Sequence, residues 1–146
     1  MPGNDEVQTI LVVDDEKSMR EFLEIMLAKE GYQIFLAASG EEAFQILERK
    51  KLDLIVTDIR MKDIDGIEVL KKAKGRSPKT MVVMVSAFAS AETAVEAMKE
   101  GAYDYMQKPF KVEELKKIVK DAIRSKRPLP RMEERINERA VPTLVV

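Results

Sequence analysis

The sequence contains no cysteine and no histidine among its 146 residues. Without cysteine there are no disulfides, no thiolate nucleophiles and no cysteine metal sites. Without histidine there is no imidazole base and no ligand of the type that zinc most commonly uses. Any chemistry in these 146 residues must therefore rest on carboxylates, hydroxyls, lysine and a hard cation.

Long hydrophobic runs are also absent. No apolar run approaches the roughly 20 residues of a membrane span, and the first residues, MPGNDEVQ, lack the basic and apolar regions of a signal peptide. We therefore expect a cytoplasmic protein with no membrane segment. The formal net charge of −1 gives little support to direct nucleic-acid binding. A hydrophobic fraction of 45% over this length allows one domain with a core and a short appendage.

Apolar strands alternate with amphipathic helices along the chain, a pattern that predicts βα units around a parallel sheet. The predicted strands are Ile10–Val13, Gln33–Ala37, a run beginning at Leu52, Met81–Val85 and Asp104–Gln107. Between and after them, apolar residues at helical spacing predict five helices. The first carries Met19, Phe22, Leu23, Met26 and Leu27, and the fourth and fifth are Ala91–Glu100 and about Val112–Arg127. The pattern predicts an α/β fold.

Local signals mark the ends of several helices. Gly31 follows the first helix and is a C-terminal cap signal. Ser39 can cap the second helix, with Glu42 three residues later completing a capping box. The third helix, which carries Ile67, Val69 and Leu70, is expected to end near Gly75.

Polar residues follow the predicted strands at one edge of the sheet. The run Leu52–Met61, LDLIVTDIRM, leads from a buried strand directly into Asp58, and the first strand leads into Asp14 and Asp15. Ser86 and Lys108 follow the fourth and fifth strands. Ligands of parallel α/β sheets bind beyond the carboxyl ends of the strands. We therefore expect these five residues to form one site.

Electrostatics indicate what this site holds. Carboxylates about 5 Å apart repel by roughly 3 kcal/mol per pair at an effective dielectric of about 20, and Lys108 alone cannot neutralise three of them. An oxygen-only site that leaves positions open to water and phosphate suits Mg²⁺. A cation, a lysine, a hydroxyl and a carboxylate nucleophile together favour a site that accepts a phosphoryl group.

Each residue taken alone has a plainer interpretation. Asp14 and Asp15 could cap the helix that follows them, and Asp58 could be a loop residue. Ser86 and Lys108 could be ordinary surface residues, and Tyr105 a half-buried aromatic. It is their joint placement at strand ends that favours a site.

Two other protein classes fit the pattern less well. A phosphohydrolase of the aspartyl-nucleophile type uses Asp-x-Asp on its first strand, whereas Asp14 and Asp15 are adjacent and point differently. A dinucleotide-binding module needs a Gly-x-Gly-x-x-Gly turn, and Asp14–Arg20 contains no glycine.

The sequence resembles the receiver domains of two-component response regulators over about residues 7–127. The matching segments are ILVVDDE, LIVTDIRM, the loop end Asp65-Gly66, VVMVSA with Ser86, and YDYMQKPF with Tyr105, Lys108, Pro109 and Phe110. The segments TDIRM and GAYDYMQKPF are most similar to receivers of NtrC-type, sigma-factor-dependent activators. The resemblance implies a doubly wound five-stranded parallel sheet of the flavodoxin/CheY-like (βα)5 type, with strand order 2-1-3-4-5.

The resemblance also implies roles for the site residues. Asp58 would accept phosphate from the phosphohistidine of a sensor histidine kinase, which must be another molecule. Asp15, Asp58 and the Arg60 backbone carbonyl would ligate Mg²⁺, with Asp14 acting mainly through water. Lys108 would pair with Asp58 or the phosphoryl oxygens, while Ser86 and Tyr105 would move when phosphate binds. Lys62 stands where the family usually has proline.

The expected activity is that of a phosphoacceptor rather than a turnover enzyme, with transcription as the expected output. Phosphorylation would expose a surface formed by Ala91–Glu100, the fifth strand and the last helix, through which a homodimer could form. We divide the chain into a receiver domain, 7–127, and a C-terminal linker or tail, 128–146. The chain is either a stand-alone regulator or part of a longer activator.

Overall fold

The computed structural model describes residues 7–125 except 88 and 89. Strands and helices alternate along this part of the chain, as the sequence predicts. The elements are β1 Thr9–Val13, α1 Lys17–Ala28, β2 Gln33–Ala37, α2 Gly40–Arg49, β3 Leu54–Thr57, α3 Gly66–Arg76, β4 Met81–Ser86, α4 Ala91–Lys99, β5 Asp104–Gln107 and α5 Val112–Ser125. The last two predicted residues of the final helix, and the tail 128–146, lie outside the described residues.

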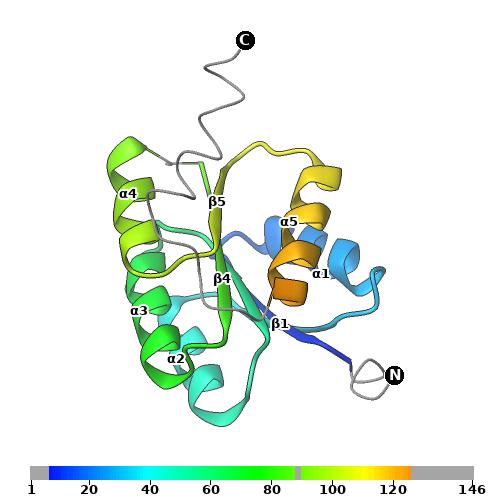
Figure 1. The fold of residues 1–146 in the computed structure, drawn as a ribbon, viewed down its shortest axis with the longest axis horizontal. Coiled ribbons are helices and arrows are strands. Elements are labelled where there is room, and N and C mark those ends of the chain that lie inside the picture. The colour runs from blue at the N-terminus through cyan, green and yellow to red at the C-terminus, as the bar shows by residue number, and fades with distance from the viewer. Residues whose placement is uncertain (1–6, 88–89, 126–146) are drawn as a thin grey trace.

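The five strands form one parallel sheet in the order β2-β1-β3-β4-β5. Helices α1 and α5 cover one face of this sheet, and α2, α3 and α4 cover the other (Figure 1). The predicted doubly wound α/β fold and its strand order are confirmed. The order reverses beside β1, so the carboxyl ends of β1 and β3 meet at the switch point where such sheets bind ligands.

Two hydrophobic clusters, one on each face of the sheet, form the core. Side chains alternate between faces along a strand, so Ile10 and Val12 belong to the cluster under α1 and α5, and Leu11 and Val13 to the other. Every residue of β3 and β4 is buried. This double burial explains why their sequences are continuous apolar runs.

The predicted helix ends are largely correct. Gly31 adopts a φ of 97°, in the left-handed region that favours glycine, just after α1. The Ser39 hydroxyl accepts the Glu42 backbone N–H, as expected for the cap of α2. The other half of the predicted capping box is wrong, because the Glu42 carboxylate accepts the N–H of Ala38, at 2.7 Å, instead of that of Ser39.

The apolar face predicted for helix α1 is only partly buried. Leu23, Met26 and Leu27 are buried, but Phe22 is 43% exposed. Phe22 lies at the edge of this apolar face. Its ring centroid is 6.5 Å from that of Phe110, in the segment after β5. Within the described residues, no helix has the length and apolar character needed to cross a membrane.

Candidate functional site

The carboxyl ends of β1 and β3 bring the three predicted acids together. The strands pair in parallel with Val13 opposite Thr57, so that Asp14 and Asp58 are the next residues of each. One carboxylate oxygen from each of Asp14, Asp15 and Asp58 lies within 4.8 Å of the others. At this separation each pair repels by about 3 kcal/mol at an effective dielectric of about 20.

Lys108 reaches this cluster from the end of β5. Its ammonium Nζ lies 2.7 Å from Asp14 Oδ2 and 3.3 Å from Asp58 Oδ2. Its backbone N–H donates to the Ser86 carbonyl, and the Lys108–Pro109 peptide bond is cis. Three carboxylates and one ammonium give the four side chains a formal charge of −2, so the cluster retains negative charge.

Burial and pairing shift the pKa values of Asp14 and Lys108. Burial raises the pKa of Asp14 above its usual value, although the hydrogen bond from Lys108 and that from the Glu16 backbone oppose the change. Burial lowers the pKa of Lys108, but the hydrogen bonds and charges of Asp14 and Asp58 together outweigh it, and the pKa ends above its usual value. Lys108 therefore stays charged at neutral pH.

Backbone contacts fix the position of Asp58, which is 8% exposed. Its own N–H donates to the Val13 carbonyl at 2.9 Å, which continues the ladder between β1 and β3. Its Oδ1 accepts the Ile59 N–H at 2.7 Å, and its Oδ2 faces Lys108. The Thr57 hydroxyl donates to the Asp58 carbonyl oxygen at 2.9 Å. The carboxylate is thus held at the sheet edge by main chain on one side and a cation on the other.

Asp14 and Asp15 differ in their surroundings although they are adjacent. Asp14 is buried and its Oδ1 accepts the Glu16 N–H at 2.9 Å, whereas Asp15 is exposed. The Asp14 bond is local to the turn, and the residue before α1, Glu16, makes no side-chain cap. Helix capping therefore does not account for these two acids.

The donor set fits a hard cation. The three carboxylates offer only oxygen ligands, and Asp15 gives the cluster a side open to solvent. Hard divalent cations prefer such ligands and retain water at their remaining positions. The residues present can therefore hold a metal ion.

The loop between β3 and α3 packs closely against Asp58. The N–H of Gly66 donates to the Ile59 carbonyl at 2.7 Å. A Cβ atom on Gly66 would overlap the Asp58 carbonyl oxygen. Asp65 caps α3 by accepting the Glu68 N–H at 2.9 Å. Glycine is required at position 66 because the loop returns directly over the Asp58 main chain.

The remaining predicted residues lie around this cluster. Ser86 is the buried last residue of β4, and Arg60 follows Asp58 by two positions with an exposed side chain. Tyr105 is half-buried on β5, opposite Met84 of β4, and packs on the α2, α3 and α4 side of the sheet. The roles of these residues, and those of Asp14, Asp15, Asp58 and Lys108, stay predictions.

One residue of the loop escaped the sequence-based prediction. Asp63 accepts the N–H groups of Gly40 and Glu41, which lie 23 and 22 residues earlier. An acidic residue in a turn-rich loop signals capping, but it does not reveal a helix that begins so far away in the sequence.

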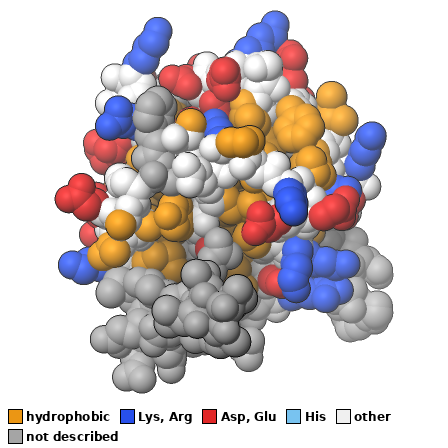
Figure 2. All heavy atoms as spheres, turned by 90° about the horizontal axis from the view of Figure 1, so that it is seen from above, with side chains coloured by type: hydrophobic (Ala, Val, Ile, Leu, Met, Phe, Trp, Pro, Cys, Tyr) orange, Lys and Arg blue, Asp and Glu red, His pale blue; other side chains and the backbone are white. Residues whose placement is uncertain are grey.

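The surface seen from above carries acidic, basic and hydrophobic side chains side by side (Figure 2). Charges of both signs are interspersed on the described part of this face.

Comparison with protein families and solved structures agrees with this geometry. Residues 10–120 match the family model described as response regulator receiver domain. AtoC, a regulatory protein of Escherichia coli K12, is 38% identical over 117 residues, which are 80% of this chain and 25% of AtoC. The response regulator PilR of Pseudomonas aeruginosa is 37% identical over 121 residues, 83% of this chain and 27% of PilR. The chain thus spans about a quarter of the length of these curated relatives.

Solved structures give the same result. A CheY-like receiver domain from Methanospirillum hungatei superposes with a TM-score of 0.81 at 30% identity, covering 83% of this chain and 97% of that one. The beryllofluoride-activated NtrC4 receiver domain dimer has a TM-score of 0.77 at 35% identity, covering 82% of this chain and 98% of that one. Both matches cover more than four fifths of this chain.

Proposed function

The chain belongs to the response regulator receiver domain family, most like receivers of NtrC-type activators, and from that premise we propose that Asp58 accepts a phosphoryl group from a sensor histidine kinase. The observation that carries this proposal is the placement of Asp58. Its carboxylate lies at the sheet edge, 3.3 Å from the Lys108 ammonium and beside two further acids. No other acid of the cluster lies at the end of β3, the position of the acceptor in the family.

The proposed reaction transfers the phosphoryl group between two side chains. A carboxylate oxygen of Asp58 attacks phosphorus, and the P–N bond of the kinase phosphohistidine breaks. Its electron pair returns to the imidazole nitrogen, which takes up a proton. Because these 146 residues include no histidine, the donor lies outside them. Water later releases the phosphate slowly, once per phosphorylation, so the domain is not a turnover enzyme.

Residues of the chain support this transfer in distinct ways. Lys108 neutralises charge that develops on the phosphoryl oxygens, and its raised pKa keeps it protonated. Asp14 anchors the Lys108 ammonium at 2.7 Å. The Ile59 N–H fixes Asp58 Oδ1, which orients the carboxylate.

We assign the metal site to Mg²⁺, held by Asp15, Asp58 and the Arg60 backbone carbonyl, with Asp14 acting through water. When bound, Mg²⁺ supplies charge neutralisation for the phosphoryl oxygens and the carboxylates. The three carboxylate oxygens within 4.8 Å of one another support this assignment.

Phosphorylation is proposed to switch the face formed by α4, β5 and α5. The phosphoryl group adds about −1.5 to −2 charge and three acceptor oxygens, which draw the Ser86 hydroxyl toward Asp58 and allow Tyr105 to turn inward. Shifting the equilibrium between the inactive and the switched conformation from 1:99 to 99:1 needs about 5.5 kcal/mol of differential binding free energy. One charged hydrogen bond of about 1.5–3 kcal/mol, together with the pair between phosphate and Lys108, supplies that order of energy.

The proposed output, regulation of transcription, is inferred from the relatives of the chain and not from the geometry of the site. ZraR of Salmonella typhimurium, 41% identical over 114 residues, is named a transcriptional regulatory protein. We propose a cytoplasmic regulator of transcription, with residues 7–127 as the receiver and 128–146 as a linker or tail. We also propose a phosphorylation-dependent homodimer through the α4, β5 and α5 face, and the dimer formed by the beryllofluoride-activated NtrC4 receiver domain supports the dimerisation.

Phosphotransfer from a panel of labelled histidine kinases tests this function. One kinase is expected to lose its label rapidly to this chain in the presence of Mg²⁺ and to keep it when EDTA is added. Failure of every kinase and of small phosphodonors to label the chain would contradict the proposal. Sustained hydrolysis of a generic phosphate ester would instead favour a phosphohydrolase.

A further inference from the structure

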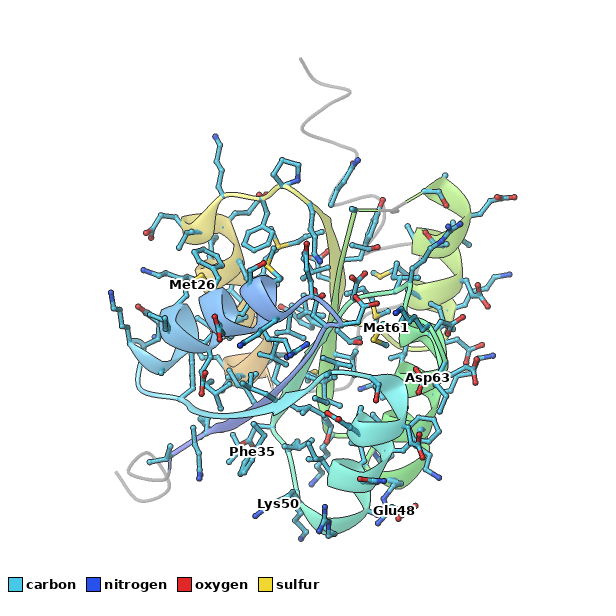
Figure 3. The ribbon with its side chains drawn as sticks, turned by 180° about the vertical axis from the view of Figure 1, so that it is seen from behind. Met26, Phe35, Glu48, Lys50, Met61 and Asp63 are labelled. Atoms are coloured by element: carbon cyan, nitrogen blue, oxygen red, sulfur yellow. The ribbon has the colours of Figure 1, made fainter. Side chains whose placement is uncertain are left out.

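The loop between β3 and α3 is joined to the start of α2 by Asp63. The two carboxylate oxygens of Asp63 accept the N–H of Gly40 at 3.3 Å and the N–H of Glu41 at 3.2 Å. Figure 3 shows Asp63 and Met61 at this end of α2, and Glu48 and Lys50 at the other. Asp63 thus links two segments that are distant in sequence.

A close backbone contact reinforces this link. Gly40 is buried, and a Cβ atom placed on it would overlap the side chain and carbonyl oxygen of Ile64. Glycine at position 40 therefore lets the loop approach the first turn of α2. The hydrogen bonds of Asp63 and the packing of Ile64 act at the same place.

The carboxylate of Asp63, which accepts these two hydrogen bonds, is a favourable group at the N-terminus of a helix. The first N–H groups of a helix have no partner within it, and the helix dipole favours an anion there. Ser39 accepts the N–H of Glu42, and Asp63 accepts the two before it. The pKa of Asp63 is lowered, first by the Ile64 backbone N–H and further by those of Glu41 and Gly40.

The same loop carries the main chain proposed to bind the metal. It leaves β3 at Asp58, passes Arg60, and returns at Gly66, whose N–H donates to the Ile59 carbonyl. Asp63 lies between these points, three residues after Arg60, so its bonds to α2 restrain the loop that carries the Arg60 carbonyl.

We propose that Asp63 is a positioning residue for the metal site. By tying the loop to α2, it holds the Arg60 backbone carbonyl beside the Asp15 and Asp58 carboxylates. This inference rests on the proposed function, because it concerns the same Mg²⁺ site. Since coupling between two sites is reciprocal, binding of Mg²⁺ also stabilises the contact between the loop and α2.

The test compares Asp63→Ala with Glu68→Gln, which removes an exposed acid in the first turn of α3. Mg²⁺ affinity is measured by NMR titration, together with hydrogen exchange at the Gly40 and Glu41 amides. We expect Asp63→Ala to weaken Mg²⁺ binding on the order of tenfold, the lower end for residues that support metal ligands. Glu68→Gln shows how much of that change arises from charge alone, and it is expected to stay near wild type.

Amide exchange separates positioning from general stability. In wild type, Mg²⁺ is expected to slow exchange at Gly40 and Glu41, and in Asp63→Ala this effect is lost while exchange in β3 and β4 is unchanged. Equal Mg²⁺ affinity in the two variants would overturn the inference, as would Mg²⁺-dependent protection that survives Asp63→Ala. If wild type binds no Mg²⁺ at millimolar concentration, the proposed metal site itself fails.

Discussion

Lys108 donates its shorter hydrogen bond to Asp14, 2.7 Å from Nζ to Oδ2, and its longer one, 3.3 Å, to Asp58. The ammonium is therefore held mainly by an acid that is not the proposed acceptor. Lys108 can stay anchored while Asp58 gains a phosphoryl group, and its second bond is then available to the new oxygens. This arrangement supports the proposal that Lys108 responds to the phosphoryl charge and is not part of the nucleophile.

Substitution Lys108→Ala is expected to leave Asp58 able to accept phosphate but to weaken the conformational response. The reason is that the variant lacks the cation that pairs with the phosphoryl oxygens. NMR shifts induced by beryllofluoride, a phosphoryl mimic, measure the response. In wild type they should extend into residues 91–120, and in the variant they should stay near Asp58. A variant that switches as fully as wild type would refute this role.

The pairing of Lys108 also predicts a dependence of stability on pH. Its pKa in the folded protein is raised above the usual 10.5, because the hydrogen bonds and charges of Asp14 and Asp58 together outweigh the effect of burial. A raised pKa contributes stability below 10.5 that is lost as the pH rises through the folded value. We therefore expect the free energy of unfolding to fall above this pH, by up to about 1.4 kcal/mol per pH unit for this group.

Variant Lys108→Met provides the comparison, since it keeps an unbranched side chain without the charge. Urea unfolding of both proteins at a series of pH values between neutral and strongly alkaline gives the two slopes. The difference between wild type and variant should shrink as the pH rises. A constant difference would show that the ammonium does not carry the effect.

Substitution Asp15→Ala should abolish Mg²⁺ binding in the millimolar range, because it removes one of two proposed direct side-chain ligands. Asp15 is exposed, so the free energy of unfolding without metal should change by no more than about 0.5 kcal/mol. Isothermal titration with MgCl₂ and urea unfolding measure these two quantities. An unchanged metal titration would remove Asp15 from the site.

Two glycines of α3 offer a matched test of the loop geometry. A Cβ on Gly66 would overlap the Asp58 carbonyl oxygen, whereas none of the surrounding atoms lies within 4 Å of a Cβ on Gly75. Gly66→Ala should therefore lower the free energy of unfolding by about 1–3 kcal/mol, the usual cost of forcing atoms into packed space. Gly75→Ala should raise it by up to about 1 kcal/mol. Similar effects of both in urea unfolding would contradict the close approach at Gly66.

The strands and helices could be predicted closely because their signals are local, whereas the strand order was implied by the family resemblance. Continuous apolar runs mark β3 and β4, which are buried on both faces of the sheet. The helical spacing of Leu115, Ile118 and Val119 marks the buried face of α5. The placement of Asp58 followed as well, because parallel strands end at a common edge. These inferences need only the period of the sequence and the direction of the chain.

Details that depend on tertiary contacts could not be predicted. The exposure of Phe22 and the bonds of Asp63 to α2 each depend on how separate elements approach one another. The donor to the Glu42 carboxylate, the Ala38 N–H, lies one residue before the predicted donor, Ser39. The preference of Lys108 for Asp14 is decided by differences of less than 1 Å between side chains of three strands. Distance differences of this size cannot be inferred from the amino-acid sequence.

The most direct test of the proposed function is to locate the phosphoryl group. Wild-type protein is incubated with a small phosphodonor and Mg²⁺, and the acid-labile, hydroxylamine-sensitive label is mapped by mass spectrometry beside that of Asp58→Ala. We predict one phosphoryl group per chain on Asp58 in wild type and none in the variant, because no other residue has the position of the nucleophile. Full labelling of Asp58→Ala would contradict the assignment.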